Sequence, residues 1–508
     1  MPDSWLDAFF DWLYRRQPVS ATFIGVHAFD DRLPDLSASG MAALANEAAS
    51  LLAATPRETT PLDHVLAQGF LRIQQWEANS QHLNRNPVHF TGESIFGIVS
   101  LLLRARVESA SARLLAIPAF LDVARREVTS APRAWIERAR HECAGAHLLL
   151  EDIPLEFPSL RCAAQVADAA FARFDAFLAD LAPTDEYACG AEALELLLRN
   201  AHFSELDASG VERLALECIA DEQAFLAETP PPTADTSPPP IDGNYLAGFT
   251  TMWQAVCDLA REQGRLTVPE WPVRFVERPP WARRAAPYLY FLPYRAPSPL
   301  DTPAVVEYLV PPGSDASTIK LNHVLHHASW GHHFQNWHAY RAQSRIGQIA
   351  AVDCASRIAM LCGGTMAEGW ASYAVDLAEE AGLLTSSEAY GQHRARIRMA
   401  ARAVVDVRLH QGRLSLEEAI AFYVSRVGMS VAAARGEAVK NSLFPGAACM
   451  YLLGWRTIWQ LRHELQARMS LREFHDRLLS FGSVPVSLIA RAMRVRKESS
   501  RDVQFASS

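Results

Sequence analysis

The sequence lacks any run of about 20 consecutive apolar residues, the length that a helix needs to cross a bilayer. It also lacks an excess of basic residues, because 48 Lys and Arg stand against 57 Asp and Glu, for a net charge of -9. The first absence argues against a membrane protein, and the second argues against nucleic acid as a partner. The first residues show no basic stretch followed by an apolar run and a small-residue cleavage site, so no secretory signal is expected. We therefore predict a cytoplasmic protein.

Cysteine is sparse and scattered along the chain. The eight cysteines include no Cys-x-x-Cys pair. This pattern excludes both a disulfide framework and a site in which thiolates hold a metal.

Most of the chain has the pattern of packed helices, since apolar residues recur at three- and four-residue spacing. Ser37 is a suitable N-cap for one helix, and Asp207 opens another. Residues 286–293 and 304–310 are instead short, β-branched or aromatic, and bounded by Pro and Gly, which is typical of strands. We predict a mainly α-helical protein with one small β-sheet near residues 286–310.

A proline-rich stretch at residues 229–240 cannot be helical, and we expect it to be an exposed loop. It separates an N-terminal helical region, residues 1–228, from a second region, residues 241–508. The sequence leaves open whether these regions are separate domains or two lobes of one compact unit.

Histidine is concentrated in one short segment. Six of the 17 histidines lie between residues 323 and 338. About forty residues later, Glu368 offers a carboxylate on what the pattern predicts to be a separate helix. Neutral imidazole is the commonest protein ligand for zinc and related metals, and Glu often completes such sites. We expect these side chains to form a metal site.

The spacing of the histidines requires a distorted helix. The short zincin motif places two His four residues apart, but the fourth residue after His326 is Trp330. His332 and His333 follow His326 by six and seven residues, which would put them about 9–10 Å along a straight helix. A break or π-bulge at Gly331 would allow one ion to be shared. By angle His333 shares a face with His326, but the distortion leaves the choice between His332 and His333 open.

Two segments carry a resemblance to a known family. The first reads His326-His327-Ala-Ser-Trp330-Gly331-His332-His333-Phe-Gln335, and the second reads Glu368-Gly369-Trp370-Ala371-Ser372-Tyr373-Ala374-Val375-Asp376-Leu377. They resemble the bacterial domain-of-unknown-function 885 family, whose motif runs His-Glu-x-x-Pro-Gly-His-His-x-Gln, followed by Glu-Gly-Trp-Ala-x-Tyr-Ala-Glu-x-Leu. Similar segments at residues 18–22, 32–37, 406–410 and 445–454 extend the resemblance over most of the chain.

The family is regarded as metal-dependent peptidases of the gluzincin type, so the resemblance implies a large multi-helix, gluzincin-like body. It also implies a set of metal ligands: His326, one of His332 and His333, and Glu368. Zinc is the metal we expect, with iron or manganese as alternatives.

The chain departs from the family pattern at the position of the general base, where His327 replaces the expected Glu. The family Pro is Trp330 here, and the second Glu of the downstream motif is Val375, with Asp376 next to it. An imidazole with an unperturbed pKa of about 6.5 is a substitute proton acceptor. His327 is therefore our candidate base.

Two residues late in the chain are candidates for stabilising a developing oxyanion. In gluzincin-like sites a Tyr or His from a late helix often donates a hydrogen bond for this purpose. Tyr451 and His410 lie in the matching part of the chain, and His410 ends one of the family-like segments. The alternative for Tyr451 is a phenol packed in the core.

These residues support three hypotheses. The first is a metal-dependent hydrolase that acts on a peptide or a small amide. The second is a repurposed metalloenzyme, such as a non-haem iron oxygenase, a lyase or a cyclase, that acts on a small metabolite. The third is a metal-binding pseudoenzyme that serves as an interaction module. The sequence predicts neither the substrate nor the oligomeric state.

Overall fold

The structure, a computed structural model, describes residues 3–56, 61–229, 231, 245–289, 298–301, 303–351 and 357–494. Its contacts group the chain into two units. Unit 1 comprises Met1–Thr60, Ala67–Glu186 and Arg278–Leu292, and unit 2 comprises Pro61–Leu66, Tyr187–Glu277 and Pro293–Ser508. Most of the proline-rich stretch at 229–240 lies outside the described residues, so its interpretation as a loop stays a prediction.

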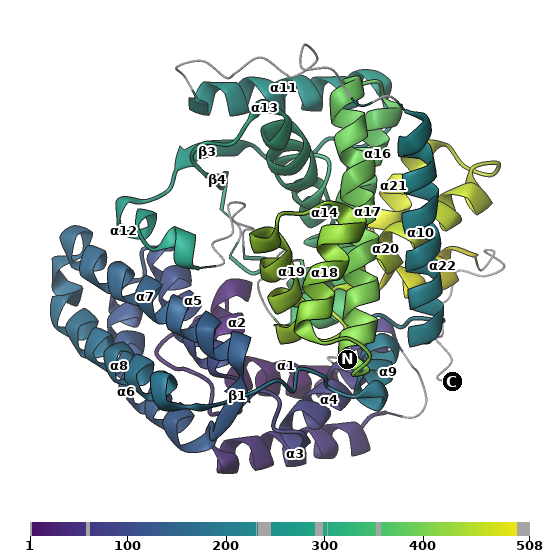
Figure 1. The fold of residues 1–508 in the computed structure, drawn as a ribbon. Coiled ribbons are helices and arrows are strands. Elements are labelled where there is room, and N and C mark those ends of the chain that lie inside the picture. Colours follow the sequence, from purple (N-terminus) through teal and green to yellow (C-terminus); the bar gives the residue numbers. More distant parts are fainter. Residues whose placement is uncertain are drawn as a thin grey trace. The chain divides into compact units, whose positions relative to one another are not determined.

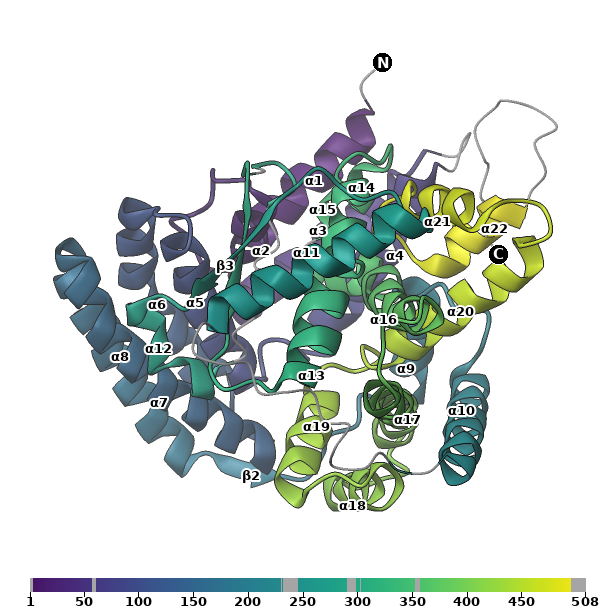
Figure 2. The ribbon, with the colours of Figure 1, turned by 90° about the horizontal axis from the view of Figure 1, so that it is seen from above.

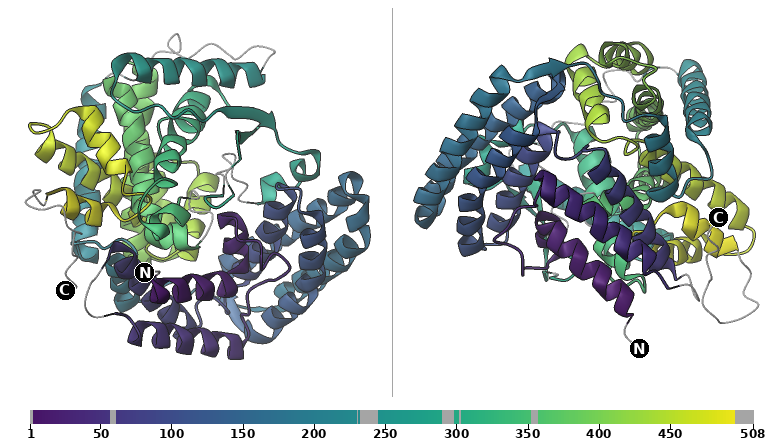
Figure 3. Two further views of the ribbon diagram at one scale, coloured as in Figure 1. Left: turned by 180° about the vertical axis from the view of Figure 1, so that it is seen from behind. Right: turned by 90° about the horizontal axis from the view of Figure 1, so that it is seen from below.

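Unit 1 is built from helices, among which α5 to α8 pack against one another as a row of neighbouring rods (blue in Figure 3). Its helices are α1 (Ser4–Arg16), α2 (Pro18–Ile24), α3 (Ala38–Ala53), most of α4 (Leu62–Asn79), α5 (Pro87–Leu102), α6 (Val107–Glu127), α7 (Arg133–Glu156), η1 (Pro158–Leu160), α8 (Arg161–Asp180), α12 (Pro280–Arg283) and η3 (Ala286–Tyr288). Strands β1 (Ser130–Pro132) and β2 (Ala182–Thr184) pair in parallel.

Unit 2 carries the histidine-rich segment. Its helices are α9 (Ala191–Asn200), α10 (Ala208–Glu228), α11 (Tyr245–Gln263), α13 (Ala316–Thr318), the π-helix η4 (Ile319–Ala328), α14 (His332–Ala339), α15 (Arg345–Ile349), the π-helix η5 (Ala359–Gly363), α16 (Gly364–Glu380), α17 (Ser386–His410), α18 (Leu416–Val427), α19 (Val431–Leu443), α20 (Cys449–Leu465), α21 (Leu471–Leu479) and α22 (Val486–Arg494). The long helices α10, α16 and α17 run in a similar direction in Figure 1, and Figure 2 shows α16 and α17 nearly end-on.

Local sequence signals start many of these helices. Ser37 accepts a hydrogen bond from the Gly40 amide at the start of α3, as expected for an N-cap. At the start of α17, Thr385 and Glu388 form a reciprocal capping box. Gly428 ends α18 in the left-handed conformation, with φ 74°, which glycine adopts without a steric penalty.

The prediction of a mainly α-helical protein is confirmed, and the small sheet is present with different strands from those expected. β4 (Val306–Val310) falls within the predicted strand 304–310, but its partner is β3 (Val273–Glu277), in parallel. The expected strand at 286–293 is wrong over its first residues, because Ala286–Tyr288 forms a 3-10 turn. Pro287 lacks the amide donor that a sheet ladder uses and fits the first positions of a helical turn. Residues 290–293 lie outside the described part of the chain.

Helices α16 and α20 meet at two glycines. A Cβ atom added to Gly454 would lie 1.9 Å from the Thr365 carbonyl oxygen, and one added to Gly369 would lie 2.4 Å from the Gly454 carbonyl carbon. The missing side chains therefore allow the two backbones to touch. This contact fixes the position of α16, the helix that carries Glu368.

The substitution Gly454→Ala is expected to destabilise the fold by about 1–3 kcal/mol, because the clash is with backbone atoms and the helices must separate. Urea unfolding of the variant measures the change. Gly436 lies inside α19 with no atom within 4 Å of an added Cβ, so Gly436→Ala is the matched control. The control should gain up to about 1 kcal/mol, since Ala is the better helix former. Equal effects at both positions would contradict the proposed backbone contact.

Candidate metal centre

The histidine-rich segment is distorted where the spacing requires it. The π-helix η4 ends at Ala328, and α14 begins at His332 after a break. A Cβ atom on Gly331 would lie 1.9 Å from the His326 carbonyl oxygen, so the chain passes back against η4 at this residue. The break brings the ring of His332 to 4.9 Å from the ring of His326, between centroids.

Three imidazoles and one carboxylate meet at this break. One ring nitrogen from each of His326, His327 and His332 lies within 4.8 Å of the others. Oε2 of Glu368, from α16, lies 3.5 Å from Nε2 of His326 and 3.8 Å from Nε2 of His332. Ligand atoms at about 2.1 Å from one tetrahedral ion are separated by about 3.4 Å. The donor set of His326, His332 and Glu368 therefore fits a divalent metal.

His333 lies apart from this cluster. Its Nε2–H donates a hydrogen bond to the Trp271 carbonyl oxygen at 2.9 Å, and its ring stacks on the Trp271 ring at 5.3 Å. Burial lowers the pKa of His333 to about 4, so the ring is neutral. Of the two histidines that the spacing left open, the structure places His332 beside Glu368.

His327 has a defined tautomer. The Asn322 carbonyl oxygen only accepts hydrogen bonds, so Nδ1 of His327, 2.8 Å away, carries the proton and Nε2 is the acceptor. Burial holds the pKa of His327 well below its usual value, and the neighbouring His326 and His332 lower it further. The ring centroids of His326 and His332 lie 4.8 Å and 5.2 Å away. At position 327, where the family motif has Glu, this protein therefore has a neutral imidazole that belongs to the cluster.

The carboxyl group of Glu368 is ionised. Burial alone would raise its pKa, but the hydrogen bond with His326 and the electrostatic effect of the neighbouring imidazoles hold the pKa below its usual value. A buried divalent cation needs a negatively charged ligand to offset part of its charge, and the ionised carboxylate of Glu368 supplies one beside the two imidazoles.

Trp330, which stands where the family has Pro, joins the break to its surroundings. Its indole Nε1–H donates to the Val256 carbonyl oxygen of α11 at 3.1 Å, and its side chain is fully buried. Trp370 of α16 donates in turn to the Trp330 carbonyl oxygen at 2.8 Å. The first bond connects the break to α11, and the second connects it to α16, the helix that carries Glu368.

The two late candidates lie in other surroundings. His410 is fully buried, with its Nε2 3.0 Å from the Asn441 carbonyl oxygen and 3.4 Å from Asp406. The Arg402 guanidinium lies 5.1 Å from the centre of the Tyr451 ring. His410 thus connects α17 to α19 in the described contacts, and a role for either residue at the metal remains a prediction.

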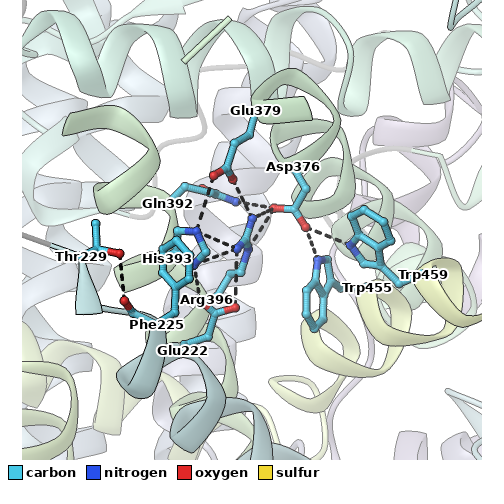
Figure 4. A network of polar contacts seen from close by, with 10 residues as sticks. All are labelled: Glu222, Phe225, Thr229, Asp376, Glu379, Gln392, His393, Arg396, Trp455 and Trp459. Carbon is cyan, nitrogen blue, oxygen red and sulfur yellow. Dashed lines mark hydrogen bonds and ion pairs between the residues drawn. The ribbon is translucent and has the colours of Figure 1, made fainter. Parts of the chain in front are cut away.

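Sequence reasoning missed a charged network that holds α16 in place, shown in Figure 4. Asp376 Oδ1 accepts hydrogen bonds from Arg396 and Gln392, and Oδ2 accepts from the indoles of Trp455 and Trp459. These partners belong to α17 and α20. The only signal in the sequence was the carboxylate next to Val375, where the family has Glu.

His393 extends the network to α10. Its Nδ1 lies 2.5 Å from Glu222, its Nε2 lies 3.5 Å from Glu379, and its ring stacks on Phe225 at 3.8 Å. Burial lowers the pKa of His393, but the bonds to the two glutamates outweigh it and raise the pKa to about 9.

The raised pKa predicts how stability changes with pH. A group whose pKa is higher in the folded state contributes fully below its unfolded pKa, about 6.5, and loses that contribution as pH rises through 9. The free energy of unfolding in urea should therefore fall between pH 6.5 and 9. The difference between wild type and His393→Gln should shrink over the same range. A difference that stays constant with pH would show that His393 is not charged in the folded protein.

Together the helical body and the cluster of imidazoles and carboxylate define a protein with a candidate metal centre. The family model described as "Bacterial protein of unknown function (DUF885)" matches residues 18–230 and 241–493. The chain belongs to this family. The match shows the family alone, so the gluzincin-type activity that the resemblance implies stays a proposal. No curated protein matches the chain significantly.

Two solved structures share the fold. A "putative lipoprotein of unknown function" from Shewanella oneidensis is 19% identical, with a TM-score of 0.72 over 96% of this chain and 98% of that one. A "putative lipoprotein" from Colwellia psychrerythraea is 18% identical, with a TM-score of 0.71 over 96% of this chain and 97% of that one.

The prediction of a cytoplasmic location is wrong by this comparison. Both similar structures carry the description "putative lipoprotein", and lipoproteins are anchored to a membrane rather than located in the cytoplasm. Within the ranges that the structure covers, no helix combines the length and the apolar character needed to cross a bilayer.

Proposed function

We propose that this protein is a metal-dependent hydrolase that cleaves a peptide or a small amide, with zinc as the metal. The observation that carries the proposal is the position of Glu368 Oε2, 3.5 Å and 3.8 Å from the Nε2 atoms of His326 and His332. His326 of η4 and His332 of α14 are close in the sequence, and Glu368 comes from α16, 36 residues after His332. Two imidazoles and one carboxylate are the protein ligands of many hydrolytic zinc sites.

The residues present divide the work of such a site. His326, His332 and Glu368 would hold the ion, which would polarise a substrate carbonyl and lower the pKa of water to about 7. His327 Nε2 is the proton acceptor for the attacking water and later returns the proton to the leaving nitrogen. The Asn322 carbonyl oxygen fixes the Nδ1 proton and stays hydrogen-bonded when the ring becomes charged.

The substitution His327→Glu tests this division, because it restores the base of the family. Hydrolysis of a library of blocked dipeptides and small amides should rise by about 10-fold or more, and His327→Ala should lower it by about 100-fold. The measurement is kcat/KM for each zinc-loaded variant, with the zinc content determined in parallel. If wild type and His327→Glu both hold zinc and cleave no member of the library, the hydrolase proposal fails.

The imidazole at position 327 also favours a second candidate. Two His and one carboxylate form the facial ligand set of non-haem iron oxygenases, which need no glutamate base. In that case the protein would act on a small metabolite. Iron in the purified protein, with an absorption spectrum that changes on exposure to oxygen, would support this alternative over hydrolysis.

A further inference from the structure

Unit 2 contains a hollow that none of the proposed chemistry uses. It has a volume of about 480 Å³ and is lined by residues of α10, α20 and α22, by the segment before α10 and by Thr365 of α16. Figure 1 shows α20 beside α22, in the yellow part of the chain, with α10 next to them. The volume falls in the range of small-molecule sites, about 300–1,000 Å³.

Part of the wall of this hollow is apolar. Leu453 and Val486 are buried beneath it, and Leu206 is 39% exposed at its side. An exposed leucine on the wall of a hollow loses contact with water when an apolar group enters. The hollow therefore suits a ligand with an apolar body.

The charged residues of the hollow are only partly paired. It is lined by Arg213, Arg456, Arg494, Glu205 and Glu217. Of these, Arg494 pairs with Glu464 outside the hollow, and Glu205 pairs with Arg491.

Three charges remain in the hollow without an ion pair. Arg456 and Glu217 form no ion pair or hydrogen bond with any residue that the structure describes. Arg213 donates a hydrogen bond to the Ser209 hydroxyl, at 3.2 Å, and its charge also acts on the nearby Asp207 carboxylate without forming an ion pair. Two guanidinium groups and one carboxylate leave one net positive charge in a protein of net charge -9. The planar guanidinium group of arginine can donate two parallel hydrogen bonds to the two oxygens of a carboxylate. A single negative charge balances the site, whereas a phosphate dianion would leave one excess negative charge in a hollow that also contains the Glu217 carboxylate.

We propose that this hollow binds a small monocarboxylate with an apolar chain, its carboxylate on Arg456 and Arg213 and its chain against Leu206, Leu453 and Val486. The proposal does not depend on the metal centre, since none of the lining residues belongs to the cluster of His326, His327, His332 and Glu368. The proposal assigns a second small-molecule site to the chain, next to Thr365 at the start of α16.

Calorimetric titration of the full-length protein with octanoate tests the proposal. Octanoate should bind, and Arg456→Ala should weaken its binding by about 10- to 100-fold, the loss expected for a charge-assisted hydrogen bond. The matched control is Arg426→Ala, because Arg426 is also exposed, forms no ion pair in the described part of the chain, and lies outside the hollow on α18. The control should leave the affinity unchanged.

Two further titrations separate the parts of the proposal. Leu206→Asp, at an exposed position that tolerates a polar side chain, should also weaken octanoate binding by placing a carboxylate against the apolar chain. Inorganic phosphate should bind at least about 10-fold more weakly than octanoate. Absence of octanoate binding, equal binding by Arg456→Ala and Arg426→Ala, or phosphate binding as tight as that of octanoate would each overturn the proposal.

Discussion

Replacing His332 by alanine is expected to lower the affinity of the protein for zinc by about 100-fold or more. His332 is 1% exposed, and its Nε2 lies 3.8 Å from Glu368 Oε2. Because the site is buried, water from solvent cannot readily replace the lost imidazole as a metal ligand. Loss of a residue that merely supports a metal ligand already lowers metal affinity by about 10- to 100-fold. Loss of the ligand itself should lower the affinity at least as much. Competition with a chromophoric chelator measures the change in affinity.

The control for this experiment is the neighbouring residue. His333→Ala removes an equally buried imidazole, but one that donates to the Trp271 carbonyl oxygen rather than facing Glu368. It should lower the free energy of unfolding while leaving zinc affinity within about twofold of wild type. A loss of zinc affinity in His333→Ala with none in His332→Ala would reverse the assignment of the two histidines.

Replacing Asp376 by alanine is expected to lower the free energy of unfolding by about 3–5 kcal/mol. Asp376 is 2% exposed and accepts hydrogen bonds from two indoles, an amide and the Arg396 guanidinium. The Arg396 side chain is only 11% exposed and forms ion pairs with both Asp376 and Glu379. Removal of the Asp376 carboxylate therefore leaves a nearly buried positive charge with one carboxylate partner fewer. Removing one partner of a buried charge pair lowers the free energy of unfolding much more than removing one partner of an exposed pair.

An exposed ion pair provides the comparison. Glu464 pairs with Arg494 at 2.7 Å, but both side chains are more than 40% exposed. Glu464→Ala should therefore change the free energy of unfolding by less than about 1 kcal/mol. Guanidinium unfolding of both variants gives the two values. Similar values for Asp376→Ala and Glu464→Ala would show that the network in Figure 4 does not stabilise α16.

Local signals made much of the helical fold predictable. Ser37 and Asp207 both act as N-caps, because a side-chain oxygen that bonds an amide three residues later depends only on its immediate neighbours. The pairing of β3 with β4 was not predictable in the same way. Its register joins Val273 to Val306 across a long intervening segment, and periodicity carries no information on such a partner.

The candidate site divides in the same way. The residue types and the need for a distortion near Gly331 followed from the sequence, since imidazoles six residues apart cannot share an ion on a straight helix. The choice of His332 over His333 did not follow. It depends on how far the chain turns between the end of η4 and the start of α14, where the buried Trp330 donates a hydrogen bond to α11. The network around Asp376 was hidden for a similar reason, because its partners come from three other helices.

The most direct test of the account is the metal content of the protein purified without added metal. Elemental analysis should find about one zinc per chain in wild type, and dialysis of Glu368→Ala under the same conditions should remove it. Iron or manganese at the same stoichiometry would keep the ligand set and move the proposed chemistry to the second candidate. No metal in wild type, or unchanged metal in Glu368→Ala, would contradict a centre built from His326, His332 and Glu368.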